Sequence, residues 1–140
     1  MKDIVEKITK SIYTKRYILL ENFLNSMDNN HYVSNNNDTL DICHEYNLKQ
    51  LSFTLNKRNN SVIILDMIES NGNNTGTEFM KDLCKYADKN EKILALSPTD
   101  MFVGKENYNR LVNFYKKFGF RETTHKDNKY THCKMIRLWK

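Results

Sequence analysis

The sequence has little glycine, almost no proline and no long hydrophobic run. Its 140 residues include 4 glycines and 1 proline. No apolar stretch approaches the roughly 20 residues that cross a bilayer, so we expect no membrane partner. The first residues, Met1–Lys7, carry charges where a secretory signal peptide would have an apolar core, so we expect no export signal.

Cysteines are few as well. Cys43, Cys84 and Cys133 are an odd number without close spacing, which argues against a dense disulfide framework. Without an export signal, we expect reduced thiols in a cytoplasmic protein. The 19 asparagines are typical of an AT-rich genome, and if the source is a virus this cytoplasm is that of the host.

The length and the charge limit the classes of protein to consider. A chain of 140 residues is expected to form one domain, spanning 1–140, with a core of its own. The net charge of +5 favours anionic partners such as phosphates, CoA or nucleic acid, although it also serves solubility. Because no single Lys/Arg block gathers this charge, we expect nucleic acid not to be the partner.

The first half of the chain predicts helices followed by strands. Apolar residues recur at helical spacing in two sets, Ile4, Val5, Ile8 and Ile12, then Leu20, Phe23, Leu24 and Met27. One interrupted helix or two short ones would fit, and a short strand within residues 2–9 is the alternative. Turn-like residues then separate three strands, Thr39–Tyr46, Lys49–Asn56 and Val62–Ile68, which predict an antiparallel meander.

The second half alternates between helices and strands. We expect a helix over Thr75–Lys89, a buried strand over Ile93–Leu96 and a second helix that ends at Gly119. That helix has one apolar face, made of Tyr108, Leu111, Val112, Tyr115 and Phe118. Two closing strands, Phe120–Thr124 and His132–Leu138, complete a mixed α/β (α+β) sheet with helices on its faces.

A turn of small residues, Asn71–Thr77, joins an apolar strand to a helix. Small residues let the backbone approach an anion, and the free N–H groups of a helix start can hold it. The turn lacks the Lys-Ser/Thr pair of a P-loop and the three-glycine spacing of a dinucleotide fingerprint. A connection of this kind without any ligand is equally common.

A second motif, Phe114-Tyr115-Lys116-Lys117-Phe118-Gly119-Phe120, lies further along the chain. Taken with the turn, residues 61–120 resemble the GCN5-related N-acetyltransferase (GNAT) family. The turn is similar to that family's (Arg/Gln)-x-x-Gly-x-(Gly/Ala) element, and Phe114–Phe120 is similar to its Leu-Tyr-x-x-x-Gly-Phe element. Asn71 stands where the family has Arg or Gln, and Asn74 replaces a glycine. The resemblance implies a mostly antiparallel central sheet flanked by helices.

The resemblance also implies an acetyl-CoA site, and we expect no metal. In that family the strand before the turn splays from its neighbour, and its backbone, here near Ile68 and Ser70, pairs with pantetheine. The turn, with the helix start, would bind the pyrophosphate through Asn71, Gly72, Asn73, Asn74, Thr75, Gly76 and Thr77. The family's pantetheine-binding Asn falls at Tyr108, beside Asn107, and Arg110 would reach the phosphates.

Two residues are the expected catalytic groups. Tyr115 is the implied acid that protonates the departing thiolate, and its alternative role is to fill the apolar face of its helix. Glu69 is the expected base, and its alternative is a solvated carboxylate at a strand end. Asp66, which alternates with Ile64 and Ile68 and could face the same side as either, is a further candidate, and His125 and His132 are weaker ones. Cys43-His44 and His132-Cys133 lack zinc-finger spacing.

The sequence therefore predicts an acetyl-CoA-dependent N-acetyltransferase that acts on a primary amine. The acceptor pocket would be shaped by residues 10–35 and the loop near 125–130. One alternative is a catalytically idle member of the same fold that binds CoA or a partner protein. Another is a small basic nucleic-acid-binding domain. A homodimer is possible, because dimers are frequent in families of this type.

Overall fold

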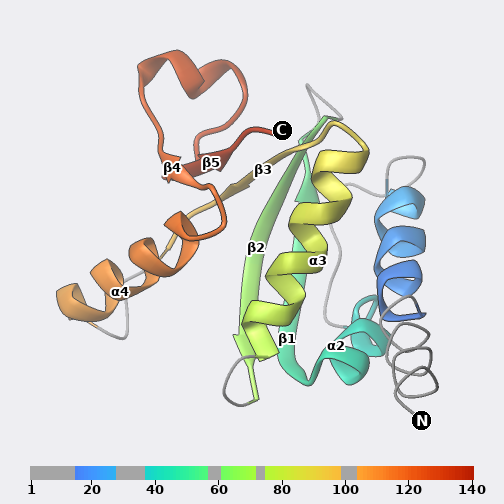
Figure 1. Cartoon of the computed structure of the whole chain (residues 1–140). Coiled ribbons are helices and arrows are strands. Elements are labelled where there is room, and N and C mark those ends of the chain that lie inside the picture. Colours follow the sequence, from blue (N-terminus) through green and yellow to red (C-terminus); the bar gives the residue numbers. More distant parts are fainter. Residues whose placement is uncertain (1–14, 28–36, 57–60, 72–74, 99–103) are drawn as a thin grey trace, which may run out of the picture.

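The computed structural model describes residues 15–27, 37–56, 61–71, 75–98 and 104–140. A first helix occupies residues 15–27. The elements that follow are α2 (Leu40–Tyr46), β1 (Leu48–Leu55), β2 (Val62–Ser70), α3 (Thr75–Lys89), β3 (Ile93–Leu96), α4 (Gly104–Lys116), β4 (Arg121–Glu122), the 3-10 helix η1 (His125–Lys129) and β5 (Met135–Arg137). Figure 1 shows this order along the chain.

The strands form one open sheet in the order β1-β2-β3-β5-β4. β2 and β3 are parallel, whereas the other three pairs are antiparallel. α3 connects β2 to β3, as a crossover between parallel strands requires. The predicted fold class, a mixed and mostly antiparallel sheet with helices, is confirmed.

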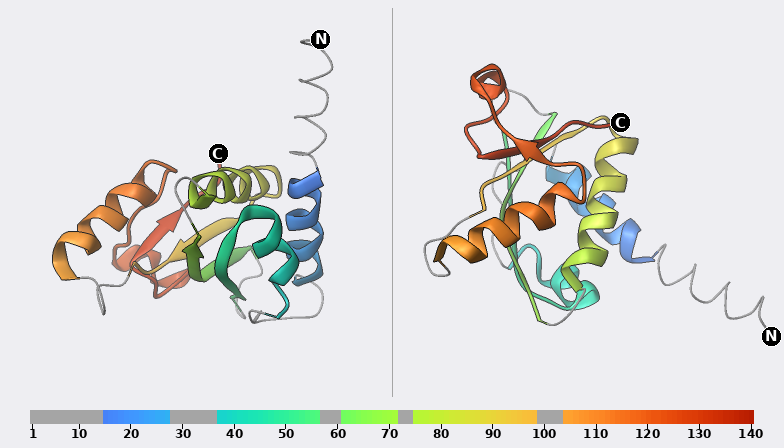
Figure 2. Two further views of the ribbon diagram at one scale, coloured as in Figure 1. Left: turned by 90° about the horizontal axis from the view of Figure 1, so that it is seen from below. Right: turned by 60° about the vertical axis from the view of Figure 1, so that its left-hand side comes forward.

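The main hydrophobic core lies between the sheet and the helices. Figure 2 shows α3 along one face of the sheet. From α3, Phe79 and Leu83 are fully buried in this core, together with Phe53 of β1. The first helix and α2 add further buried side chains, and the hydroxyl of Tyr46 donates to Asp82 at 2.6 Å, which ties α2 to α3. This packing fixes the start of α3 relative to β1 and β2.

A smaller cluster covers the opposite face of the sheet. It contains Val62, Ile93, Ala95 and Ile136, and the partly buried Tyr130 and Cys133 pack against it. The segment between β4 and β5 therefore lies over this second face. Within the described ranges, no helix is both long enough and apolar enough to cross a membrane.

Arg137 ties the C-terminal strand to α3 and to the turn after α4. Its guanidinium donates to both carboxylate oxygens of Asp88 on α3, each at 2.9 Å, and its Nε donates to the carbonyl of Phe118 at 2.7 Å. Gly119 follows with φ 94, the left-handed conformation that favours glycine. The predicted glycine at the end of this helix is therefore confirmed.

One predicted strand is wrong. The segment Thr39–Tyr46 forms the helix α2 over Leu40–Tyr46. Its β-branched and aromatic residues favour a strand locally, but Ile42, Cys43 and Tyr46 are buried on one face at helical spacing. Asn47 then ends the helix in the left-handed conformation, with φ 56.

The other elements agree with the sequence, with differences at their ends. The helix over Thr75–Lys89, the strand over Ile93–Leu96 and the β1–β2 hairpin are confirmed. The closing strands are shorter than predicted, because η1 and its flanking turns occupy most of residues 123–134. The alternative strand within residues 2–9 lies outside the described residues.

Candidate functional site

β2 extends well beyond its parallel neighbour. β3 pairs with only the first four residues of β2, up to the pair Leu65↔Leu96. In the remaining stretch, Asp66–Ser70, the last four residues pair on the other side with β1. Within the described residues, the edge of Asp66–Ser70 that faces away from β1 therefore has no strand partner (Figure 1). Main-chain N–H and C=O groups along an edge of this kind can pair with an extended ligand.

A β-bulge lies at the point where the two strands part. Ser52 pairs with Met67 and Phe53 pairs with Leu65, so Asp66 is an extra residue in β2. The extra residue shifts the alternation of side chains between the two faces. Leu65 and Ile68, three residues apart, both pack against the main core.

The bulge turns the carboxylate of Asp66 away from that core. Asp66 accepts a hydrogen bond from the hydroxyl of Thr54, whose strand partner is Ile64. Asp66 therefore shares the face of Ile64 and not that of Ile68. The sequence left both faces open, because nothing in its composition marks a bulge.

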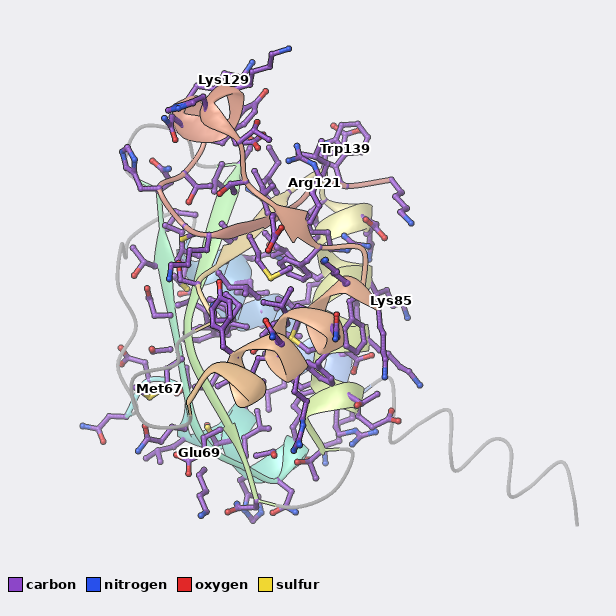
Figure 3. All side chains as sticks on the ribbon, turned by 90° about the vertical axis from the view of Figure 1, so that its left-hand side faces the viewer. Met67, Glu69, Lys85, Arg121, Lys129 and Trp139 are labelled. Atoms are coloured by element: carbon purple, nitrogen blue, oxygen red, sulfur yellow. The ribbon has the colours of Figure 1, made fainter. Side chains whose placement is uncertain are left out.

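Glu69 lies on the same side of β2 as Met67, opposite α3, as Figure 3 shows. Its carboxylate is 3.7 Å from the ammonium of Lys49, and both side chains are more than half exposed. An ion pair this exposed contributes little to stability. Glu69 is thus a solvated carboxylate that a ligand can reach from the face of the sheet opposite α3.

The start of α3 comes just after the free edge of β2. The N–H of Asn71 donates to the carbonyl of Asn47 at 3.2 Å, which holds the end of β2 beside the end of α2. Gly72, Asn73 and Asn74 lie outside the described residues. Thr75, Gly76 and Thr77 form the first turn and are half-buried. A Cβ built on Gly76 would meet no atom within 4 Å, so open space lies before this turn.

Tyr115 lies on α4 in the main core and is 7% exposed. Its ring centroid is 5.2 Å from that of Phe114 and 5.8 Å from that of Phe120. Burial raises the pKa of Tyr115 to about 12, so the hydroxyl is protonated at neutral pH. This packing fits a residue that fills the apolar face of its helix, and its role as an acid stays a prediction.

The remaining predicted cofactor residues are placed on two elements. On β2, Ile68 is half-buried against the core and Ser70 is exposed. On α4, Asn107 lies in the first turns, and Arg110 is exposed. Cys84 of α3 approaches the chain after α4, with Sγ 3.9 Å from the carbonyl of Phe118.

Cys43 and Cys84 are buried, and Cys133 is partly buried. Burial raises the pKa of Cys84 to about 11 and also raises the pKa of Cys43. Neither thiol is therefore a thiolate at neutral pH. Among the described residues, no group of three His, Cys, Asp or Glu side chains could hold a metal ion.

A groove of about 610 Å³ opens on the face of the sheet opposite α3. Its lining comes from β1, β2, the residue after β3 and the segment before β5. These residues are Thr54, Leu55, Asn56, Ile64, Ser97, Asn128, Lys129, Tyr130, Thr131, His132 and Cys133. The sequence indicated the loop near 125–130 as part of a pocket, but the partners from β1 could not be inferred without the strand order.

We compared the chain with known proteins by family, by sequence and by structure. No protein-family model, curated protein or solved structure matches it. The function is therefore inferred from the motifs and from the geometry of β2, α3 and α4.

Proposed function

We propose that the protein is an acetyl-CoA-dependent N-acetyltransferase that acetylates a primary amine. The observation that carries the proposal is the free edge of Asp66–Ser70, which leads from the bulge to the start of α3. Five strand residues span about 16 Å, at about 3.3 Å each. The pantetheine arm of CoA is extended and contains two amide groups, so it can pair with such an edge as an added strand would.

The start of α3 supports the position of the pyrophosphate. The first N–H groups of a helix have no partner within the helix, and its dipole favours an anion. The absence of a side chain at Gly76 leaves room for close approach. Glu78 in the same turn opposes an anion, but its carboxylate is 3.8 Å from the ammonium of Lys81, which offsets part of that charge.

The proposed reaction is direct attack of a neutral amine on the thioester carbonyl. The new C–N bond forms, the C–S bond breaks, the nitrogen gives up its extra proton to a base or to water, and the sulfur leaves as a thiolate that takes up a proton. The ammonium form of the amine must first lose a proton to a base or to water. A backbone N–H near Ile68 is the group that would polarise the carbonyl.

Tyr115 is the proposed donor to the departing thiolate. A phenol with a pKa of about 12 does not transfer its proton readily to a thiolate whose conjugate acid has an ordinary pKa of about 8.5. We therefore expect Tyr115 to stabilise the thiolate chiefly by hydrogen bonding, with the final proton drawn from solvent.

Two carboxylates compete for the role of base. Asp66 lies at the bulge, and Glu69 lies three residues further on, about 10 Å along the strand. With the pyrophosphate at α3, the thioester end of the arm would reach the bulge, which favours Asp66. Comparison of Asp66→Asn with Glu69→Gln tests this, because only loss of the base should lower kcat and shift its pH profile.

The experiment that tests the proposed function has two parts. Acetyl-CoA at 100 times its Kd should stabilise the fold by about 2.7 kcal/mol, which raises Tm by several degrees. Release of free thiol from acetyl-CoA should then accelerate with at least one member of a panel of primary amines. No change of Tm at millimolar acetyl-CoA would refute the proposal, and binding without amine-dependent release would favour the catalytically idle alternative.

A further inference from the structure

The groove opens where the two parallel strands part. Ile64 is the next-to-last residue of β2 that pairs with β3, and Ser97 is the first residue after β3. Both line the groove on the face opposite α3. A donor arm held on the free edge of β2 would present its thioester near this point. An acceptor in the groove would therefore reach that thioester from the face of the sheet opposite α3.

The outer wall of the groove is held in one conformation. Arg121 donates to both carboxylate oxygens of Asp127, at 2.8 and 3.0 Å, and the N–H of Thr124 donates to the same carboxylate at 2.7 Å. The side-chain amide of Asn56 donates to the carbonyl of Tyr130, which joins this wall to β1. A wall fixed in this way loses little conformational entropy when a ligand binds.

Among the described residues, the groove is lined by one positive side chain, that of Lys129, and by no negative one. The imidazole of His132 belongs to the same lining. The ammonium of Lys129 lies 4.8 Å from the centroid of the Tyr130 ring, which also lines the groove. Residues 116–140 contain eight Lys or Arg against two Asp or Glu, whereas the first 115 residues contain 14 against 15. One wall of the groove, residues 128–133, therefore comes from the basic part of the chain.

A carboxylate lies beside the groove at the bulge, because the lining residue Thr54 donates a hydrogen bond to the exposed Asp66. A ligand with an amine at one end and an anion at the other matches this polarity. Its ammonium group would lie toward Asp66, and its anion would lie toward Lys129 and His132.

We propose that the amine acceptor carries an anionic group, a carboxylate or a phosphate, which Lys129 and His132 in the groove recognise. This inference rests on the proposed acetyltransferase function and narrows its substrate class. Polyamines and aminoglycosides, which carry only positive charges, would be poor acceptors, because the ammonium of Lys129 repels them.

The test uses matched acceptors with the whole chain. Phosphoethanolamine is compared with ethanolamine, and β-alanine is compared with propylamine, by thiol release from acetyl-CoA. We expect kcat/KM to favour one anionic acceptor over its neutral partner by at least about tenfold, the effect of one charge-assisted contact. Lys129→Gln should raise KM for that acceptor but not KM for its neutral partner. Lys126→Gln, exposed on the same 3-10 helix but outside the lining, is the control.

Direct binding separates this inference from the proposed function. Each acceptor is titrated into the protein without acetyl-CoA and followed by NMR. Lys129-dependent binding of an anionic amine supports the groove assignment even if acetyl-CoA does not bind, in which case only the enzyme proposal falls. If acetyl-CoA reacts but anionic and neutral amines are equivalent, or if Lys126→Gln and Lys129→Gln behave alike, the groove assignment is wrong.

Discussion

Gly76 offers the sharpest test of the acetyl-CoA site. It lies in the first turn of α3, and its φ is not in the left-handed region. A Cβ at this position would touch nothing within 4 Å. Neither backbone conformation nor packing therefore requires glycine here, and a ligand that approaches the backbone would give a reason for its presence.

The Gly76→Ala substitution should have opposite effects on stability and on binding. Alanine in place of glycine within a helix stabilises a fold by about 0.5 kcal/mol, because the unfolded chain has less backbone freedom to lose. For a domain of this size the expected rise in Tm is about 2 °C. If the pyrophosphate lies against this turn, the new methyl group displaces it and weakens acetyl-CoA binding by about tenfold, or 1.4 kcal/mol.

Isothermal titration calorimetry with acetyl-CoA and thermal unfolding measure the two effects. The same substitution at Gly119 is the matched control. Gly119 has φ 94, and a Cβ there would lie 3.4 Å from Nε of Arg137, so Gly119→Ala should lower Tm without changing acetyl-CoA affinity.

Two outcomes would contradict the prediction for Gly76→Ala. If Gly76→Ala binds acetyl-CoA as tightly as the unchanged protein, no phosphate approaches the first turn of α3. If Gly76→Ala lowers Tm as much as Gly119→Ala does, the space before Gly76 is not open in solution. Either outcome would remove one of the two ends that define the proposed pantetheine path.

Three further predictions concern other parts of the molecule. Tyr115→Phe should lower kcat while leaving acetyl-CoA affinity nearly unchanged, and an unaltered kcat would remove Tyr115 from the mechanism. The hydrogen bonds from Arg137 hold the pKa of Asp88 below its usual 3.8, so this stabilisation is complete above that pH and is lost as the pH falls through the lower folded value. The free energy of unfolding, measured by urea titration, should therefore fall less between about pH 5 and pH 2 in Asp88→Asn than in the unchanged protein. Native alkylation followed by mass spectrometry should modify the half-buried Cys133 before the two buried cysteines.

The spacing of apolar residues predicted those helices and strands whose own sequence determines their structure. The spacing of Phe79, Leu83 and their neighbours gave the full length of α3, and the apolar run over Ile93–Leu96 predicted a buried strand. Gly119 was recognisable as a helix-ending residue because glycine readily adopts the left-handed conformation found there. These signals are local, so they survive without knowledge of the tertiary structure.

The prediction of Thr39–Tyr46 as a strand was wrong because local preference competes with tertiary contacts. The hydroxyl of Thr39 donates to the carbonyl of Leu51 at 2.6 Å, a partner twelve residues away that no local pattern reveals. A helical signal was nevertheless present in the spacing of Ile42 and Tyr46 and in Asn47, a residue that tolerates the left-handed conformation.

The candidate site was only partly accessible from the sequence. The motifs indicated the strand, the turn and the helix, but the bulge at Asp66 depends on pairing with β1 and leaves no compositional trace. For the same reason, the groove could not be assembled in advance. Its walls come from β1, from the end of β3 and from the segment before β5, which the strand order brings together.

The bulge at Asp66 also determines which mutations β2 can accept. Deletion of this one residue would restore regular alternation, with Leu65 still opposite Phe53 and Met67 still opposite Ser52. Ile68 would keep its place against the core, and the strand would lose only the carboxylate to which Thr54 donates. The packing of β2 therefore does not need the extra residue, so a chain without Asp66 should fold while lacking the carboxylate that we favour as the base.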